Sequence, residues 1–317
     1  MSRVAVVGAG AWGTALALQA HRAGCAVSLW ARDPAPLRAT RRSPHLPDQA
    51  LPDGIALLDA LPGPGVDAVL LAVPVQHLRA VAGGLHAAAP LVACCKGVEA
   101  GTGRLPLEIL HELHPACPGA VLTGPNFAHE VAAGLPAAAV LACTDPALRA
   151  DLAGLLASPG YRIYGGDDPL GAGLGGAAKN VMAIAAGSVM GAGLGENARA
   201  ALITRGLAEL SRLVIACGGR AETVAGLSGL GDLLLTCTGS ASRNYTLGLA
   251  LGRGEALADV LARRGGVTEG VATAPALLAR AAGVDLPVCA AVATLLGGTV
   301  TLDGAIAALL ARPRRDE

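Results

Sequence analysis

Two neighbouring polar residues, Lys179 and Asn180, interrupt the run GGAAKNVMAIAAG, which otherwise contains only glycine, alanine and apolar side chains. A surface helix normally carries several charges on its wet face, so this run indicates a buried helix. An unpaired ammonium is costly in such surroundings. Lys179 therefore either extends to water or to a partner at the rim of the helix, as long lysines often do, or it lines a site.

A second lysine, Lys96, follows the apolar run LVACC and precedes Gly97. This places it at the carboxyl end of an expected parallel strand, where open α/β sheets bind ligands. A lysine that is partly removed from water and lies near another cation releases its proton more readily, and can then exchange a proton with an alkoxide. If Lys96 and Lys179 converge, they would attract an anionic substrate and supply a proton.

The glycine-rich stretch at residues 226–248 holds further polar groups. Asp232 falls in an apolar run, where a carboxylate needs a cationic partner. Ser242, Arg243 and Asn244 combine a hydroxyl, a guanidinium and an amide before a helix-like run, a combination that suits a phosphate. The alternative for these three residues is a serine N-cap followed by a surface arginine.

Histidine offers no comparable chemistry. All seven histidines lie in the first half of the chain: His21, His45, His77, His86, His111, His114 and His129. The segment HELH lacks the spacing of a zinc-binding H-E-x-x-H motif, so no metal site is expected. His129 follows GPNFA and could approach a ligand cleft or lie on the surface.

The N-terminal segment VAVVGAGAWGTALA contains the pattern G-x-G-x-x-G at Gly8, Gly10 and Gly13, between an expected strand and an expected helix. These glycines permit a tight turn and a close backbone approach to a pyrophosphate, which the helix N-terminus attracts. The pattern predicts a dinucleotide site, in which Ala11 also contacts the cofactor. A plain glycine turn is the alternative.

The second expected strand ends near LWARD, where sites dedicated to NAD usually place an acid. Here Arg32 precedes Asp33. An arginine at this point can hold the 2′-phosphate of NADP(H), so both NADP(H) and NAD(H) are candidate cofactors. The alternative for Arg32 is a solvated loop arginine.

The elements expected to position these residues change character along the chain. The first half contains apolar runs typical of strands buried on both faces: RVAVVG, AVSLWA, VDAVLLAV, LVACC, AVLTG and AAAVLA, with YRIYG as a further strand. Helical periodicity covers residues 145–158, 196–219 and 268–284. We therefore predict an α/β fold, with a Rossmann-type, mostly parallel sheet over 1–175 and an all-helical, substrate-binding domain over 176–317.

Composition excludes several classes of function. The formal net charge is zero and there is one phenylalanine, which argues against a nucleic-acid partner. Eight cysteines, without a C-x-x-C pair, indicate reduced thiols in a cytoplasmic protein. No run of 18 apolar residues occurs, so no membrane insertion is expected.

In combination, these motifs resemble the bacterial type of NAD(P)-dependent glycerol-3-phosphate dehydrogenase along nearly the whole chain. The matching blocks are GAGAWGTALA, CCKGVE, GPNFAHEV, AAKN, GLGDLLLTCTGSASRN and VTEGVATA. The resemblance implies reversible reduction of dihydroxyacetone phosphate to sn-glycerol 3-phosphate, which supplies glycerophospholipid synthesis. It also implies a homodimer.

The resemblance assigns a role to individual residues. Lys179 matches the catalytic proton donor or acceptor. The substrate contacts it implies are Lys96, Gly124, Asn126, Lys179, Asn180, Asp232, Ser242, Arg243 and Asn244. The cofactor contacts it implies, beside the glycine turn, are Trp12, Arg32, Lys96, Ala128, Arg243, Val267 and Glu269. Two positions depart from the family: Asn126 replaces a serine or threonine, and Cys95 replaces a small hydroxyl residue.

Two other functions fit part of the pattern. Hydroxyacid dehydrogenases and ketopantoate reductases also join a Rossmann domain to a helical one with a catalytic lysine, but they usually separate that lysine from its asparagine by several residues. A non-catalytic sensor of NADP(H) would bind cofactor without turnover. The retained lysines and Ser242, Arg243 and Asn244 argue against a sensor.

Overall fold

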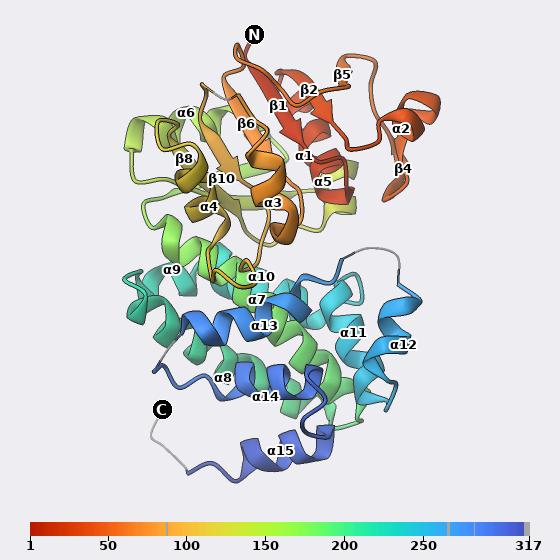
Figure 1. Ribbon diagram of the computed structural model, residues 1–317, viewed down its shortest axis with the longest axis vertical. Coiled ribbons are helices and arrows are strands. Elements are labelled where there is room, and N and C mark those ends of the chain that lie inside the picture. Colours follow the sequence, from red (N-terminus) through yellow and green to blue (C-terminus); the bar gives the residue numbers. More distant parts are fainter. Residues whose placement is uncertain (87, 265–266, 282, 314–317) are drawn as a thin grey trace. The chain divides into compact units, whose positions relative to one another are not determined.

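The computed structural model describes residues 1–86, 88–264, 267–281 and 283–313. The chain divides into two compact units. Unit 1 comprises Met1–Lys96 and Arg104–Gly173, and unit 2 comprises Gly97–Gly103 and Leu174–Glu317. Figure 1 shows that the first unit is built around a sheet and the second from helices.

A single sheet of eight strands organises the described part of unit 1, in the order β10-β9-β8-β7-β6-β1-β2-β5. The strands are β1 (Arg3–Val7), β2 (Ala26–Trp30), β5 (Ile55–Leu58), β6 (Ala68–Leu71), β7 (Leu91–Ala93), β8 (Gly119–Thr123), β9 (Ala137–Ala142) and β10 (Tyr161–Gly166). Strands β2, β1, β6, β7 and β8 pair in parallel, whereas β9 is antiparallel to β8. The carboxyl ends of β1, β6, β7 and β8 therefore share one edge, and the chain order reverses at β1, the point where such sheets bind ligands.

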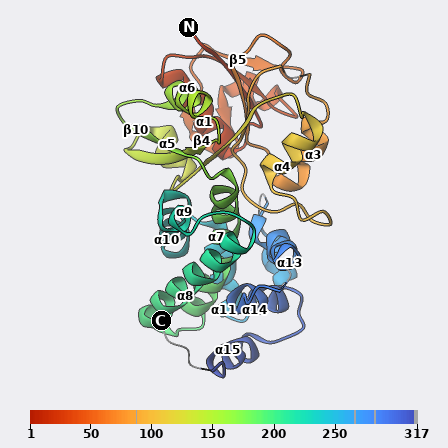
Figure 2. The ribbon, with the colours of Figure 1, turned by 90° about the vertical axis from the view of Figure 1, so that its left-hand side faces the viewer.

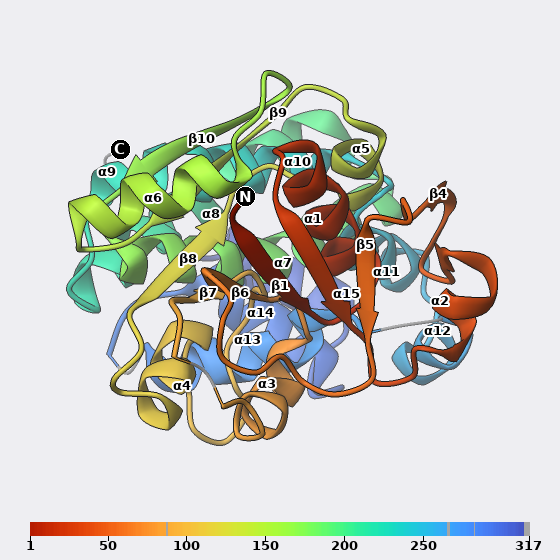
Figure 3. The ribbon, with the colours of Figure 1, turned by 90° about the horizontal axis from the view of Figure 1, so that it is seen from above.

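Helices cover both faces of this sheet (Figure 3). They are α1 (Ala11–Arg22), α2 (Ala35–Thr40), α3 (Val75–Ala82), α4 (Pro106–Leu113), α5 (Ala128–Ala133) and α6 (Pro146–Leu156). Alternate residues of β1 face opposite layers: Val4 and Val6 pack with α1, α5 and α6, and Ala5 and Val7 pack with α3 and α4. Helices α3 and α4 lie side by side (Figure 2). A separate hairpin consists of β3 (Arg42–Ser43) and β4 (Leu46–Ala50).

The regular elements in the described part of unit 2 are helices, without a strand. Its elements are α7 (Pro169–Gly191, which begins in unit 1), α8 (Gly195–Ala216), α9 (Ala221–Ala225), the π-helical turn η1 (Leu227–Gly231), α10 (Asp232–Thr238), α11 (Arg243–Gly252), α12 (Leu257–Ala262), α13 (Glu269–Arg280), α14 (Pro287–Leu296) and α15 (Leu302–Leu310). Among these described helices, none combines the length and apolar character needed to cross a bilayer.

A buried carboxylate joins two of these helices. Glu209 of α8 is 1% exposed and accepts hydrogen bonds from the backbone N–H groups of Val288 (2.7 Å) and Cys289 (3.2 Å). It thereby satisfies donors that the first turn of α14 cannot pair internally. Burial raises the pKa of Glu209, and this effect outweighs the two backbone hydrogen bonds, which lower it.

The predicted fold class is confirmed: a mostly parallel sheet is followed by helices. The seven predicted apolar runs correspond to β1, β2, β6, β7, β8, β9 and β10, and the three predicted helices correspond to α6, α8 and α13. Residue 282, inside the predicted helix 268–284, lies outside the described residues. Strand β5 and the β3–β4 hairpin were not predicted, although the turn residues Pro52, Asp53 and Gly54 directly precede β5.

Candidate active site

The glycine turn between β1 and α1 has the geometry of a backbone cradle. Gly8 has φ +109°, and a side chain there would meet the backbone of Ala72 at 3.0 Å. A Cβ at Gly13 would lie 1.7 Å from the carbonyl oxygen of Gly8, so the first helical turn packs directly on the loop. A Cβ at Gly10 would meet no atom within 4 Å. The turn is therefore closed on its protein side and open beside Gly10, at the N-terminus of α1 that begins with Ala11.

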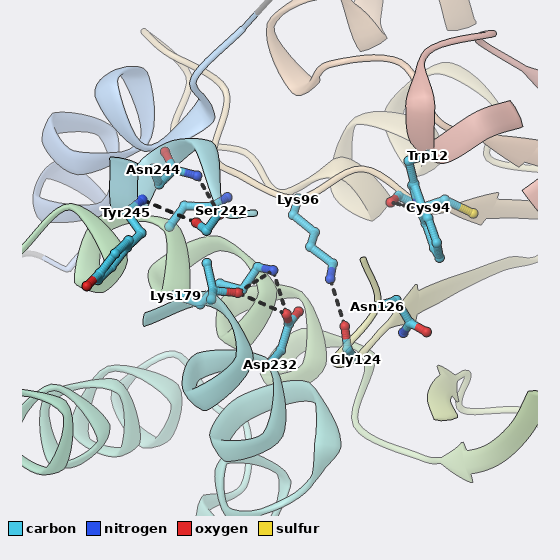
Figure 4. A network of polar contacts seen from close by, with 12 residues as sticks. Trp12, Cys94, Lys96, Gly124, Asn126, Lys179, Asp232, Ser242, Asn244 and Tyr245 are labelled. Carbon is cyan, nitrogen blue, oxygen red and sulfur yellow. Dashed lines mark hydrogen bonds and ion pairs between the residues drawn. The ribbon is translucent and has the colours of Figure 1, made fainter. Parts of the chain in front are cut away.

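Trp12 ties this helix to the neighbouring strand end. Its indole Nε1 donates a hydrogen bond of 3.0 Å to the carbonyl oxygen of Cys94, directly after β7 (Figure 4). The bond holds the start of α1 against the segment that leads to Lys96.

Arg32 lies two residues beyond the end of β2, on an exposed turn. Within the described residues its guanidinium makes no ion pair and no hydrogen bond to a protein group. The carboxylate of Asp33 accepts a hydrogen bond from the backbone N–H of Ala35 at 3.1 Å, so it caps the following turn. The guanidinium of Arg32 is thus available to a ligand, while Asp33 is engaged locally.

Lys96 reaches across the edge of the sheet. Its Nζ donates a 3.0 Å hydrogen bond to the carbonyl oxygen of Gly124, which follows β8 (Figure 4). Gly124 has φ +137°, and a Cβ there would lie 3.1 Å from the backbone of Ala139, so this position requires glycine. The structure therefore brings two predicted substrate contacts of unit 1 together.

Asn126 continues this loop and carries an unsatisfied oxygen. Its Nδ2 donates to the carbonyl oxygen of Ala138 at 3.2 Å, whereas its Oδ1 is buried and has no partner within the described residues. An acceptor buried without a donor costs free energy. Ala128 begins α5 two residues later, so its backbone N–H belongs to the unpaired first turn of that helix.

A buried polar cluster of unit 2 contains Lys179. Its side chain, from α7, places Nζ 2.5 Å from Oδ1 of Asp232 and 3.0 Å from Oγ1 of Thr236 (Figure 4). Thr236 lies one turn after Asp232 on α10, and their oxygens are 3.3 Å apart. Asp232 is fully buried and Lys179 is 9% exposed. Lys179 therefore has a partner, and Asp232 has the cation that its apolar surroundings require.

Close helix packing makes this ion pair possible. A Cβ at Gly175 of α7 would lie 2.6 Å from the carbonyl oxygen of Ser228, and one at Gly229 would lie 2.0 Å from that of Val224. Only glycines allow η1 to fold back on α9 and to press against α7. Asp232 follows η1 directly, which brings its carboxylate to the side chain of Lys179 one turn along α7.

Asn180 belongs to a second polar chain. Its Oδ1 accepts a 2.9 Å hydrogen bond from Nδ2 of Asn244, whose Oδ1 accepts a 3.0 Å bond from the backbone N–H of Gly270. The two asparagines thus connect α7, α11 and the start of α13. Glycines again allow the approach: a Cβ at Gly187 or at Gly248 would lie 2.0 Å from a backbone oxygen of the other helix.

Ser242 and Arg243 form the N-terminus of α11. The hydroxyl of Ser242 accepts a 3.2 Å hydrogen bond from the backbone N–H of Tyr245, so Ser242 is the N-cap (Figure 4). The side chain of Arg243 is exposed and makes no ion pair with described residues. Val267 is 39% exposed, and Glu269 begins α13. Ser242 is thus an N-cap, which does not decide whether it also contacts a ligand, and the side chain of Arg243 is exposed.

The buried cysteines near these groups are not nucleophiles. Burial raises the pKa of Cys237 to about 12, and it outweighs the nearby charge of Lys179, which lowers this pKa, and that of Asp232, which raises it less than Lys179 lowers it. Burial likewise raises the pKa of Cys94. Both thiols are therefore protonated at neutral pH. No group of histidine, cysteine, aspartate and glutamate in the described residues could hold a metal ion.

Sequence reasoning missed three features of the site: the pairing of Lys179 with Asp232, the bond from Trp12 to Cys94, and the part of Thr236. The only available signal for Thr236 was its spacing of four residues from Asp232, which places both on one face of a helix. Among the predicted residues, the structure joins Lys96 to Gly124 in unit 1, and Lys179 to Asp232 and Asn180 to Asn244 in unit 2.

Comparisons with known proteins identify the family. A model described as the N-terminus of NAD-dependent glycerol-3-phosphate dehydrogenase matches residues 3–149, and one described as the C-terminus matches residues 168–307. The chain is 54% identical over 316 residues to glycerol-3-phosphate dehydrogenase (NAD(P)+) of Gluconobacter oxydans, covering 98% of this chain and 97% of that protein. Identity to the Acidiphilium cryptum enzyme of the same name is 59% over 319 residues, covering 99% and 98%.

A solved structure agrees with these matches. The crystal structure of glycerol-3-phosphate dehydrogenase from Coxiella burnetii superposes with a TM-score of 0.93 at 36% identity, covering 98% of this chain and 99% of that chain. The two family models, the relatives and this structure confirm the resemblance that the motifs indicated. The chain therefore belongs to the bacterial NAD(P)+-dependent glycerol-3-phosphate dehydrogenase family.

Proposed function

We propose that this protein interconverts dihydroxyacetone phosphate and sn-glycerol 3-phosphate with NAD(H) or NADP(H), and that Lys179 is its proton donor and acceptor. The observation that carries this proposal is the arrangement around Lys179. An ammonium has three N–H donors. Asp232 and Thr236 take two of them, which leaves one for a substrate oxygen.

The residues of unit 1 fit a nicotinamide dinucleotide. The turn is closed around Gly8 and Gly13 and open at Gly10, so a pyrophosphate could approach the N–H groups at the start of α1 without meeting a side chain. We propose that Ala11, Trp12 and Ala128 also border the cofactor, with Val267 and Glu269 contributing from unit 2. When bound, the cofactor supplies or accepts the hydride.

Lys179 would act on the oxygen of the reacting carbon. As negative charge develops on the carbonyl oxygen of dihydroxyacetone phosphate, the remaining N–H of Lys179 donates a proton to it. Asp232 fixes the direction of the ammonium, and it stabilises the charged state to which Lys179 returns. Asn180 and Asn244, which hold each other at 2.9 Å, would present the rest of their donors and acceptors to the substrate.

The phosphate of the substrate requires other side chains than those that act on the reacting carbon. We propose that Arg243 offers it a fork of donors, and that Lys96, Gly124, Asn126 and Ser242 complete the substrate contacts. The unpaired Oδ1 of Asn126 supports its assignment, because a substrate hydroxyl would satisfy it.

The test is direct. Oxidation of NADPH and of NADH is followed by absorbance with dihydroxyacetone phosphate, with unphosphorylated dihydroxyacetone and with ketopantoate. We expect turnover only with the phosphorylated ketone. Preference for ketopantoate would indicate the related reductase, and cofactor binding without turnover of any carbonyl compound would indicate a sensor.

The eight cysteines are all free, and six of them are buried. We infer from these reduced thiols that the protein works in the cytoplasm.

A further inference from the structure

Two adjacent arginines, Arg263 and Arg264, follow α12, and their side chains have different partners. Arg263 forms an ion pair with Glu255. Arg264 instead donates from Nη1 to the backbone carbonyl oxygen of Arg243, at 2.6 Å. The guanidinium of Arg264 is therefore fixed at the first residue of α11, 21 residues earlier in the chain.

This contact places like charges together. Burial and the neighbouring guanidiniums of Arg263 and Arg243 lower the pKa of Arg264, and Glu255 opposes them. Glu255 is itself paired with Arg263. Within the described residues, neither Arg243 nor Arg264 forms an ion pair with a carboxylate. The start of α11 thus carries two guanidiniums, together with the positive end of a helix of 10 residues.

We propose that Arg264 is a second guanidinium of the phosphate subsite that begins at Arg243, and that a phosphate group of the ligand neutralises both. This proposal rests on the proposed function and extends it to a residue outside the family motifs quoted above. The hydrogen bond to Arg243 uses one of the five N–H donors of Arg264, so others remain for a phosphate oxygen. Two possible sources of that phosphate are the substrate and the cofactor.

The experiment compares Arg264→Gln with the matched control Arg263→Gln in the full chain, at low and at moderate ionic strength. KM is measured for dihydroxyacetone phosphate, NADPH and NADH, together with kcat. A partly exposed charge interaction of about 1 kcal/mol corresponds to about a fivefold change. We expect Arg264→Gln to raise KM for the ligand whose phosphate it binds by about three- to fivefold, with kcat within about twofold. The increase should shrink as salt is added, since salt screens exposed charges.

The three KM values separate the possible sources. A rise for dihydroxyacetone phosphate alone assigns Arg264 to the substrate phosphate. A rise for both cofactors assigns it to their pyrophosphate, and a rise for NADPH alone assigns it to the 2′-phosphate. Arg264→Lys keeps the charge and should recover most of the affinity.

Three results would overturn the proposal. The first is an unchanged set of KM values in Arg264→Gln. The second is an equal loss in Arg263→Gln, which would indicate a general effect of surface charge. The third is an increase in KM that does not depend on salt. Such a result would indicate that Arg264 only supports the structure at the start of α11. Calorimetric titration with inorganic phosphate makes the test independent of the reaction: wild type should bind phosphate more tightly than Arg264→Gln even if dihydroxyacetone phosphate is not the substrate.

Discussion

Lys179 and Asp232 form a buried ion pair between α7 and α10, with 2.5 Å between Nζ and Oδ1. The side chain of Asp232 is completely buried and that of Lys179 is 11% exposed, so each charge depends on the other. Breaking a buried pair from one side leaves an uncompensated charge, whereas removing both charges can be nearly neutral. This asymmetry separates the structural role of the pair from its chemical role.

We first predict the effect on stability. Lys179→Met and Asp232→Asn should each lower the free energy of unfolding, by about 3–5 kcal/mol for complete loss of compensation. The double variant should be less destabilised than the sum of the two single variants, because it leaves no bare charge. Urea denaturation of wild type, the two single variants and the double variant gives the coupling free energy between Lys179 and Asp232. Strictly additive losses would show that the two side chains do not depend on each other.

Loss of Lys179 should also abolish the chemistry. Lys179→Ala is expected to reduce kcat by about a hundredfold to ten-thousandfold, the usual range for a general acid. Binding of NADPH, followed by quenching of protein fluorescence or by calorimetry, should remain near normal because the glycine turn is untouched. Near-normal kcat in a folded variant would remove Lys179 from the mechanism.

Whether a feature of this structure could be predicted from the sequence depends on how far apart along the chain the interacting residues lie. Seven of the eight strands of the sheet were predictable because continuous apolar runs between turn residues are typical of strands buried on both faces. The antiparallel direction of β9 was not, since its run AAAVLA is equally apolar in either direction. Lys179 and Asp232 could each be recognised as costly in apolar surroundings. Lys179 and Asp232 are 53 residues apart, and they pair because η1 approaches Gly175 closely. No local sequence pattern predicts this approach.

The same limit applies to Arg243 and Arg264. The motif SRN predicts a phosphate contact at Arg243 by its residue types, and the structure leaves that side chain exposed at the start of α11. No sequence motif was recognised at Arg264, and its contact with Arg243 follows only from the fold.

Arg32 provides a test of cofactor preference. Because its guanidinium has no protein partner in the described residues and only NADPH carries a 2′-phosphate, Arg32→Ala should raise KM for NADPH more than KM for NADH. A lost hydrogen bond to a charged group costs about 1.5–3 kcal/mol. Arg38→Ala is the matched control, since Arg38 is paired with Asp59. Equal losses for both cofactors would mean that Arg32 does not bind this phosphate.

Glu209 makes the stability of unit 2 depend on pH. Folding raises the pKa of this carboxyl above its unfolded value, so the folded state holds its proton more tightly than the unfolded state. The contribution of the group to stability is therefore complete below the unfolded pKa and is lost as pH rises through the folded pKa. Glu209→Gln cannot titrate. The stability of wild type relative to this variant should fall as pH rises above the ordinary glutamate range of about 4, measured by urea denaturation at several pH values. A relative gain over the same range would show that the bonds from Val288 and Cys289 outweigh burial.

Arg243 provides the test of the phosphate subsite. Dihydroxyacetone phosphate is small, so most of its binding free energy must come from its phosphate. A charged hydrogen bond is worth about 1.5–3 kcal/mol, and each 1.4 kcal/mol is a factor of about ten. Arg243→Ala should therefore raise KM for dihydroxyacetone phosphate at least about tenfold, and Arg243→Lys should recover only part of this loss because an ammonium lacks the planar fork. Arg253→Ala, at the opposite end of α11, is the matched control. KM for the cofactor is measured in parallel, since Arg243 is also a predicted cofactor contact. An unchanged substrate KM in Arg243→Ala would place the phosphate elsewhere, and would leave Arg243 as the surface arginine that follows an N-cap serine.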